Sequence, residues 1–265
     1  MSPNLLATPV SDPTKLAEFS TLSHVTIIGA MVIVPIYLFA TYHAAGADRR
    51  KSLLLTLAVI IYSVVMTAFV VEWQDGFDSP YVVPVVMLTS LAIPPLLVLR
   101  WPDYFVPEQI GLDWLVGVQA FRVIGGLYLF EYGRGNVGPE FAYWAGIGDV
   151  VTGIAASGVL LFYWTTKRMP YRAVYATILF GLADFAWAYG IGVLSFETPL
   201  QVFSRDDLHA TNRFPIAMIP FLLAPIAMGF MVMTLLALRR VPADAPSIGS
   251  RPGGDAAPPI AVDPR

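Results

Sequence analysis

The sequence predicts an all-α integral membrane protein, a seven-helix bundle with its N-terminus outside and its C-terminus cytoplasmic. Three observations predict this class: the composition, seven long apolar runs and an uneven distribution of basic residues between them. Of the 265 residues, 56% are hydrophobic and 13% are charged, whereas an ordinary soluble domain has about 25% charged residues. The composition therefore argues against a soluble globular protein.

The apolar runs have the length that a transmembrane helix requires. About 20 apolar residues, each rising about 1.5 Å, cross the hydrocarbon core of a bilayer. Runs of this kind, with few charges, predict seven spans. They cover approximately residues 22–43, 52–73, 81–100, 112–132, 141–164, 171–196 and 214–238.

The segments between the spans differ in positive charge, and cytoplasmic segments carry an excess of Lys and Arg. One side has nine basic residues: Arg49, Arg50, Lys51, Arg100, Lys167, Arg168, Arg172, Arg239 and Arg240. The other side has four: Lys15, Arg134, Arg205 and Arg213. The richer side is therefore predicted to be cytoplasmic, which places the N-terminus outside.

The chain divides into three predicted segments. Residues 1–21 form a polar N-terminal segment, residues 22–240 the transmembrane domain and residues 241–265 a Pro- and Gly-rich tail. We expect the tail to be disordered in the cytoplasm, because it has too little apolar surface to order itself. A cleaved signal peptide is not expected, since the first positive cluster follows its apolar run instead of preceding it.

The composition also argues against several functions. A formal charge of −3 offers no basic excess for nucleic acid. The absence of Cys removes thiolate ligands, and the three His residues have no metal-binding spacing, so no metal site is expected. Seven helices with an outside N-terminus are similar to a microbial rhodopsin, but the seventh span has no Lys for a retinal Schiff base. Retinal is thus excluded, and no other cofactor is predicted.

Three ionisable residues lie deep inside predicted spans. Arg122 is about 15 Å into the fourth span and Asp149 about 12 Å into the fifth, at the rise of a helix. Asp184 is similarly central in the sixth span. Charges at membrane depth are costly unless paired, so we expect Arg122 to pair with Asp149, Asp184 or both. Gln119, three residues before Arg122, lies on the same helical face and is expected to join them.

Four roles are open for this polar group. The leading hypothesis is that it binds or translocates a small polar or anionic ligand or protons, because transporters place such sites near the midplane. A second is an enzyme acting on a lipid or prenyl substrate, with Asp149 or Asp184 as the acid and Glu72 and Glu131 as participants. A third is a noncatalytic subunit that packs against a membrane partner or another copy. The fourth is a purely structural ion network.

A second set of candidates falls at the predicted outer mouth of the bundle. It contains Glu72, Glu131, His209 and Arg213. The charged segment 197–213 is predicted to be either a lid over that mouth or a solvated surface loop.

Gly146-Ile147-Gly148-Asp149 matches the Gly-x-Gly-Asp string of intramembrane aspartyl proteases, and Asp184 offers a second carboxylate. In presenilin-like and prepilin-peptidase-like families, however, the partner aspartate precedes the Gly-x-Gly-Asp helix. Asp184 follows it, and the Pro-Ala-Leu string of presenilins is absent. Proteolysis is therefore not expected.

A closer resemblance rests on short strings over about half of the chain. They are Gln119-Ala120-Phe121-Arg122, Pro139-Glu140-Phe141-Ala142, Ala145-Gly146-Ile147-Gly148-Asp149, Gly153 and Arg213-Phe214-Pro215. In these strings the chain resembles small bacterial seven-helix integral membrane proteins without an assigned function. The resemblance implies that Gln119, Arg122 and Asp149 form a polar site common to the group. We expect the protein in the bacterial cytoplasmic (inner) membrane.

Overall fold

The computed structural model describes residues 19–73, 81–107, 109–196, 198–203 and 213–241, and every regular element among them is helical. Seven helical segments are long and apolar enough to cross a membrane: Thr21–Ala44, Arg49–Glu72, Val82–Arg100, Leu112–Gly133, Ala142–Thr166, Tyr171–Leu194 and Ile219–Arg239. The prediction of seven long apolar helices is confirmed. The predicted tail lies outside the described residues, apart from its first residue.

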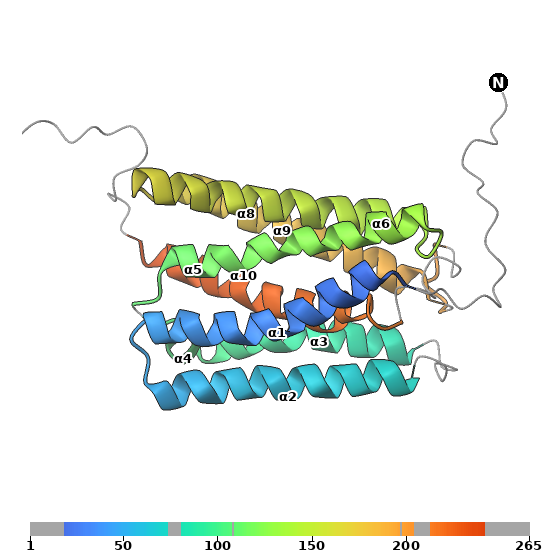
Figure 1. Cartoon of the computed structure of the whole chain (residues 1–265), viewed down its shortest axis with the longest axis horizontal. Helices are drawn as coiled ribbons and strands as arrows, with labels where there is room; N and C mark the ends of the chain where they lie inside the picture. Colours follow the sequence, from blue (N-terminus) through green and yellow to red (C-terminus); the bar gives the residue numbers. More distant parts are fainter. Residues whose placement is uncertain (1–18, 74–80, 108, 197, 204–212, 242–265) are drawn as a thin grey trace, which may run out of the picture.

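Figure 1 labels the elements along the chain. They are α1 (Thr21–Ala44), α2 (Arg49–Trp73), α3 (Val82–Arg100), α4 (Pro102–Phe105), α5 (Leu112–Gly117), η1 (Val118–Gly125), α6 (Gly126–Gly133), α7 (Pro139–Phe141), η2 (Ala142–Gly146), α8 (Ile147–Thr166), α9 (Tyr171–Leu194), η4 (Ile219–Leu223) and α10 (Ala224–Arg239). The long helices lie side by side and alternate in direction. The connections α1–α2, α3–α5 and α8–α9 and the end of α10 therefore share one end of the bundle, which we call the basic end (Figure 1).

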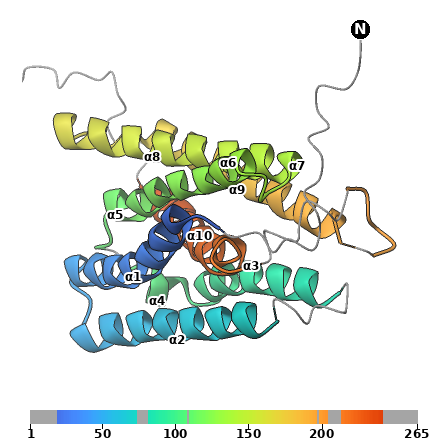
Figure 2. The same cartoon turned by 45° about the vertical axis from the view of Figure 1, so that its right-hand side comes forward.

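α10 is the central helix of the bundle. In the most apolar part of its span 67% of residues are buried, compared with 11% in α2. It packs against α3, α5 and α9 and lies in the middle of Figure 2. Small residues permit the close approach that helix association in a membrane requires. At Gly229 a Cβ atom would lie only 3.1 Å from Cβ of Pro94 in α3.

The fourth, fifth and seventh spans are not uniform α-helices, which the sequence analysis did not predict. η1 is a 3₁₀ stretch between α5 and α6, whereas η2 and η4 are single π-helical turns. Such irregular turns are frequent at functional sites and hinges. All three contribute to the polar interior described below.

The seventh helix was expected to begin at Phe214, and this is wrong. Residues 214–217 form turns, and the span begins at Ile219. The N–H of Met218 donates to the carbonyl of Pro215, three residues back, at 3.0 Å. Pro215 and Pro220 have no N–H of their own, so the regular helical ladder is interrupted on both sides of this point.

Candidate functional site

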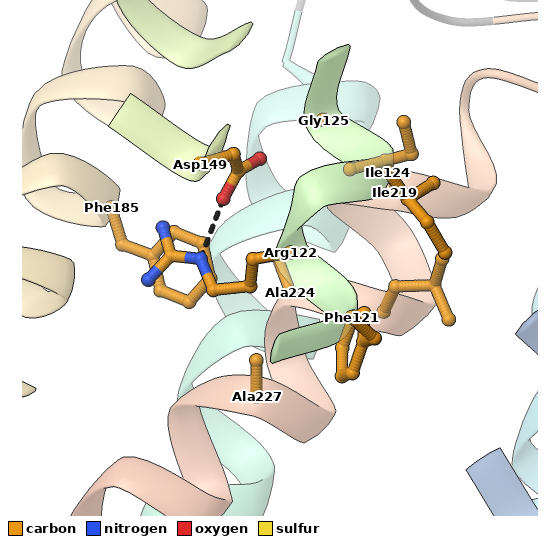
Figure 3. Close-up of a pocket in the computed structure, with 10 residues that line it drawn as sticks. Phe121, Arg122, Ile124, Gly125, Asp149, Phe185, Ile219, Ala224 and Ala227 are labelled. Atoms are coloured by element: carbon orange, nitrogen blue, oxygen red, sulfur yellow. Dashed lines mark hydrogen bonds and ion pairs between the residues drawn. The ribbon is translucent and has the colours of Figure 1, made fainter. Parts of the chain in front are cut away.

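Arg122, Asp149 and Asp184, which we call the charge cluster, lie together inside the bundle. Arg122 Nε donates to Asp149 Oδ1 at 2.6 Å, and Nη2 donates to Asp184 Oδ2 at 2.5 Å. Arg122 Nη1 donates to the carbonyl oxygen of Gly181 at 3.3 Å. All three guanidinium nitrogens are therefore engaged, and Figure 3 shows the contact between Arg122 and Asp149.

The charge cluster is almost completely removed from the surface. The side chain of Arg122 is 1% exposed, that of Asp149 10% and that of Asp184 6%. The guanidinium also lies over the ring of Phe185, with Cζ 3.8 Å from the ring centroid (Figure 3). A desolvated cation in this position is stabilised by the negative face of the ring. Both carboxylates and the ring thus surround one cation.

Each charged residue comes from a different helical span. Arg122 lies in η1, where the three residues per turn of a 3₁₀ helix place Gln119 and Arg122 on the same side. Asp149 lies in the first turn of α8, directly after η2, and Asp184 lies near the middle of α9. The charge cluster therefore joins the fourth, fifth and sixth spans.

Glycines make room for the three charged side chains. A Cβ atom on Gly125 would overlap the side chain of Asp149, and one on Gly148 would overlap the carboxylate of Asp184. At Gly181 a Cβ atom would come within 2.6 Å of Arg122 Nη1. The close approach of the three spans around the charge cluster thus requires residues without a side chain at these positions.

Two small cavities touch Asp149. One has a volume of about 10 Å³ and is lined by Arg122, Asp149 and Phe185 among others. The other has a volume of about 20 Å³ and is lined by Asp149, Tyr128 and Tyr189, with residues of η4. A water molecule needs about 10–15 Å³ measured in this way. Each cavity has room for about one water and none for a larger solute.

Gln119 is completely buried but does not bond to the charge cluster. Its Nε2 atom donates to the carbonyl of Ala227 in α10 at 3.2 Å. Its Oε1 atom has no hydrogen-bond partner among the described residues. Gln119 was expected to join the charge cluster. Gln119 and Arg122 are both buried in η1, but the partner of Gln119 is the backbone of the central helix.

Among the outer-mouth candidates, Glu131 belongs to a separate buried hydrogen-bond cluster. Glu131 in α6 is buried and accepts hydrogen bonds from Ser20 N at 3.0 Å, Ser20 Oγ at 2.6 Å and Ser23 Oγ. It also accepts one from Asn136 Nδ2 at 2.6 Å. Glu131 thereby fixes the start of α1 to the end of α6.

The other outer candidates lie elsewhere or beyond the described residues. Glu72 is exposed near the end of α2, and Arg213 is half-buried just before the turns that lead into η4. His209 lies outside the described residues. In the part of the chain that the structure describes, no group of three or more His, Cys, Asp or Glu side chains is arranged to hold a metal ion.

The family to which the chain belongs is evident from its sequence. A family model described as "Domain of unknown function (DUF8737)" matches residues 80–239, more than half of the chain. The chain belongs to the DUF8737 family. The comparisons with curated proteins and with solved structures gave no match.

The DUF8737 match extends from the start of the third span to the end of the seventh. It includes the charge cluster, Gln119, Glu131 and Arg213, and it leaves α1 and α2 outside. The strings on which the sequence resemblance rested all lie within the matched residues. Because the DUF8737 family has no assigned function, the chemistry of this chain has to be inferred from its own residues.

Sequence reasoning missed several partners of the charge cluster. Phe185 follows Asp184 directly, but spacing alone does not distinguish a ring that stacks on a cation from one that packs in the core. Tyr128 and Tyr189 line the larger cavity, and the hydroxyl of Tyr189 donates to the carbonyl of Pro220 at 2.5 Å. The carbonyl of Pro220 belongs to η4, whose irregular turn was not predicted.

Proposed function

We propose that this DUF8737 protein is an integral membrane protein that takes up and releases one proton at the charge cluster, as part of proton-linked transport. The observation that carries the proposal is an excess of one buried carboxylate: Asp149 and Asp184 both contact the single guanidinium of Arg122. Its three residues lie within helical segments that are apolar enough to span a bilayer.

The surface of the helices, as well as their length, supports membrane insertion. α2 exposes large apolar side chains along most of its length, including Leu54, Ile61 and Val65, each of which is more than half exposed. Such a surface is stable in hydrocarbon and costly in water. The basic end of the bundle then faces the cytoplasm, with the N-terminus outside, in a bacterial cytoplasmic membrane.

The orientation can be tested with reporter fusions. A reporter that is active only in the cytoplasm should be active when fused after Arg240 and inactive when inserted at Gly135, in the loop between α6 and α7. The nine-to-four distribution of basic residues between the two sides motivates this expectation. The opposite pattern would reverse the orientation, and activity at both positions would contradict the seven-span topology.

The charge of the cluster favours a proton as the transported species. Two ionised carboxylates and one guanidinium have a net charge of −1, which is unfavourable in a low-dielectric interior. One proton on Asp149 or Asp184 makes the cluster neutral while Arg122 keeps both contacts. An anionic ligand is disfavoured, because the positive charge of Arg122 is already offset by two carboxylates.

The size of the neighbouring cavities favours the same species. A proton moves along hydrogen-bonded waters and hydroxyl groups and needs no space for a larger solute. The cavities beside Asp149 have volumes of about 10 and 20 Å³, and two tyrosines line the larger one. The hypothesis of an enzyme with Glu72 and Glu131 as participants has less support, because Glu131 is fully engaged with Ser20, Ser23 and Asn136.

Infrared difference spectroscopy between low and high pH tests the bound proton directly. The wild-type protein in lipid should show the C=O stretching band of a buried protonated carboxyl group that disappears as the pH rises. Asp149→Asn and Asp184→Asn should each abolish this band, because one carboxylate then balances one guanidinium. Both variants should stay folded, since Arg122 keeps one charged and one neutral partner.

Glu131→Gln is the matched control, because it replaces another buried carboxyl group at a site with no contact to the charge cluster. This variant should retain the band. If the wild-type protein has no pH-dependent carboxyl band, or if both Asn variants retain it, the cluster does not exchange a proton and acts only as an ion network that joins three spans.

A further inference from the structure

A large apolar groove lies between α1 and α2, away from the charge cluster. Its volume is about 800 Å³, within the range of about 300–1,000 Å³ that is typical of ligand sites. We infer that this groove binds one phospholipid, with an acyl chain between the two helices and a zwitterionic, amine-bearing headgroup at the outer end. The inference rests on the membrane insertion proposed above and does not depend on proton exchange.

The groove arises from a bend in α1. The two helices are joined by a short connection at the basic end and run side by side there. Pro35 lies inside α1, where it removes a backbone hydrogen bond and favours a kink. Beyond it, the N-terminal half of α1 turns away from α2 (Figures 1 and 2). α2 continues straight, so the space between the helices widens toward the outer end.

The walls of the groove are hydrocarbon. Ile28, Val32 and Ile36 of α1 face Ile60 and Val64 of α2 across it, and Phe214 closes its outer end. Val32 is 57% exposed and Val64 63% exposed. At bilayer depth a space of this size holds neither vacuum nor unpaired water, because the apolar lining offers water too few partners. An acyl chain from the surrounding membrane can fill this space and pack against the apolar side chains that line it.

The hydroxyl groups of the groove have no free donor for a polar ligand. Thr56 Oγ1 donates to the carbonyl of Ser52 at 2.8 Å, and Ser63 Oγ to that of Val59 at 2.8 Å. Thr67 Oγ1 donates to the carbonyl of Ser63 at 2.7 Å. Each donor is therefore used within α2, four residues back. These hydroxyl groups therefore have no free donor for a polar solute, whereas an alkyl chain needs none.

Two charged residues of opposite sign are the immediate sequence neighbours of residues that line the groove. Arg213 directly precedes Phe214, and Glu72 directly follows Val71, which lines the opposite wall. Among the described residues, neither has an ion-pair partner. A headgroup with a phosphate and a primary ammonium complements this arrangement, the phosphate at Arg213 and the ammonium at Glu72. A purely anionic headgroup would leave Glu72 facing negative charge.

Native mass spectrometry of the delipidated full-length protein, titrated with defined phospholipids, tests the inference. The wild-type protein should bind one phosphatidylethanolamine more tightly than phosphatidylglycerol with the same acyl chains. Val32→Trp and Val64→Trp fill the groove and should each weaken binding roughly tenfold, because displacing even two methylene groups has an effect of this size. Glu72→Gln should remove the preference for the amine headgroup, and Arg213→Gln should weaken binding of both lipids.

Ile154→Trp is the matched control, since Ile154 on α8 is 62% exposed and lies outside the groove. Lipid binding by this variant should equal that of the wild-type protein. If Val32→Trp and Ile154→Trp weaken lipid binding equally, the proposed site is wrong. It is also wrong if the wild-type protein is a dimer that Val32→Trp dissociates, because the groove would then hold a second copy of the chain. Asp149→Asn should leave lipid binding unchanged, so this result and the infrared result can fail independently.

Discussion

Arg122→Leu is expected to lower the free energy of unfolding by about 3–5 kcal/mol, the cost of breaking a buried ion pair. The substitution leaves the carboxylates of Asp149 and Asp184 without their common cation in the interior of the bundle. It also removes the cation that lies over Phe185. Reversible unfolding in mixed detergent micelles, or thermal denaturation in lipid nanodiscs, measures the loss.

Arg134→Leu is the matched control for this prediction. Arg134 contacts Glu131 at 3.4 Å, but its side chain is 47% exposed. Glu131 is buried, but without Arg134 it keeps its hydrogen bonds from Ser20, Ser23 and Asn136. A half-exposed cation contributes about 0–1 kcal/mol, so the control should have little effect. If Arg122→Leu costs no more than Arg134→Leu, the charge cluster does not stabilise the fold.

Double variants show whether Arg122 and the two aspartates are energetically coupled or act independently on stability. In the Arg122→Leu background, Asp149→Asn or Asp184→Asn removes one stranded carboxylate and should recover part of the lost stability. Strictly additive losses in both double variants would show that the three residues are not energetically coupled. The proposed proton site would then lose its physical basis as well.

The pairing of Arg122 with Asp149 and Asp184 could be predicted from the sequence, whereas the finer geometry of the charge cluster could not. Counting residues from the start of each span places Arg122, Asp149 and Asp184 at similar depths, and the cost of isolated charges in hydrocarbon requires them to pair. Position along a span does not determine which nitrogen meets which oxygen, because that depends on the rotation of each helix. It also depends on irregular turns such as η1, which have no simple sequence signal.

Glu131 illustrates the same limit at the outer end of the bundle. Its place near a span end favoured a role at an exposed mouth, but the structure buries its carboxylate against Ser20 and Ser23. These partners are more than 100 residues away in the sequence, and no pattern links them to α6. The start of the seventh helix was misplaced for a related reason, since apolar residues continue through a turn that Pro215 and Pro220 interrupt.

Gly148→Ala is expected to destabilise the protein by about 1–3 kcal/mol or more, the usual cost of overpacking a well-packed interior. The new Cβ atom would overlap the carboxylate of Asp184, which accepts from Arg122 and would have to shift from that position. Thermal denaturation in lipid nanodiscs checks this loss, and the infrared spectrum should report a changed environment of the buried carboxyl group.

Gly158→Ala, on the same helix, is expected to change the stability of the protein in the opposite direction. Nothing lies within 4 Å of a Cβ atom at Gly158, so the substitution adds no contact and removes the flexibility of a glycine in a helix. It should stabilise the protein by about 0.5–1 kcal/mol. Combining Gly148→Ala with Asp184→Ala should recover part of the loss, because the carboxylate that obstructs the new methyl group is gone. Equal effects of the two glycine substitutions, or no recovery in the double variant, would mean that Asp184 does not pack against Gly148 as the structure places it.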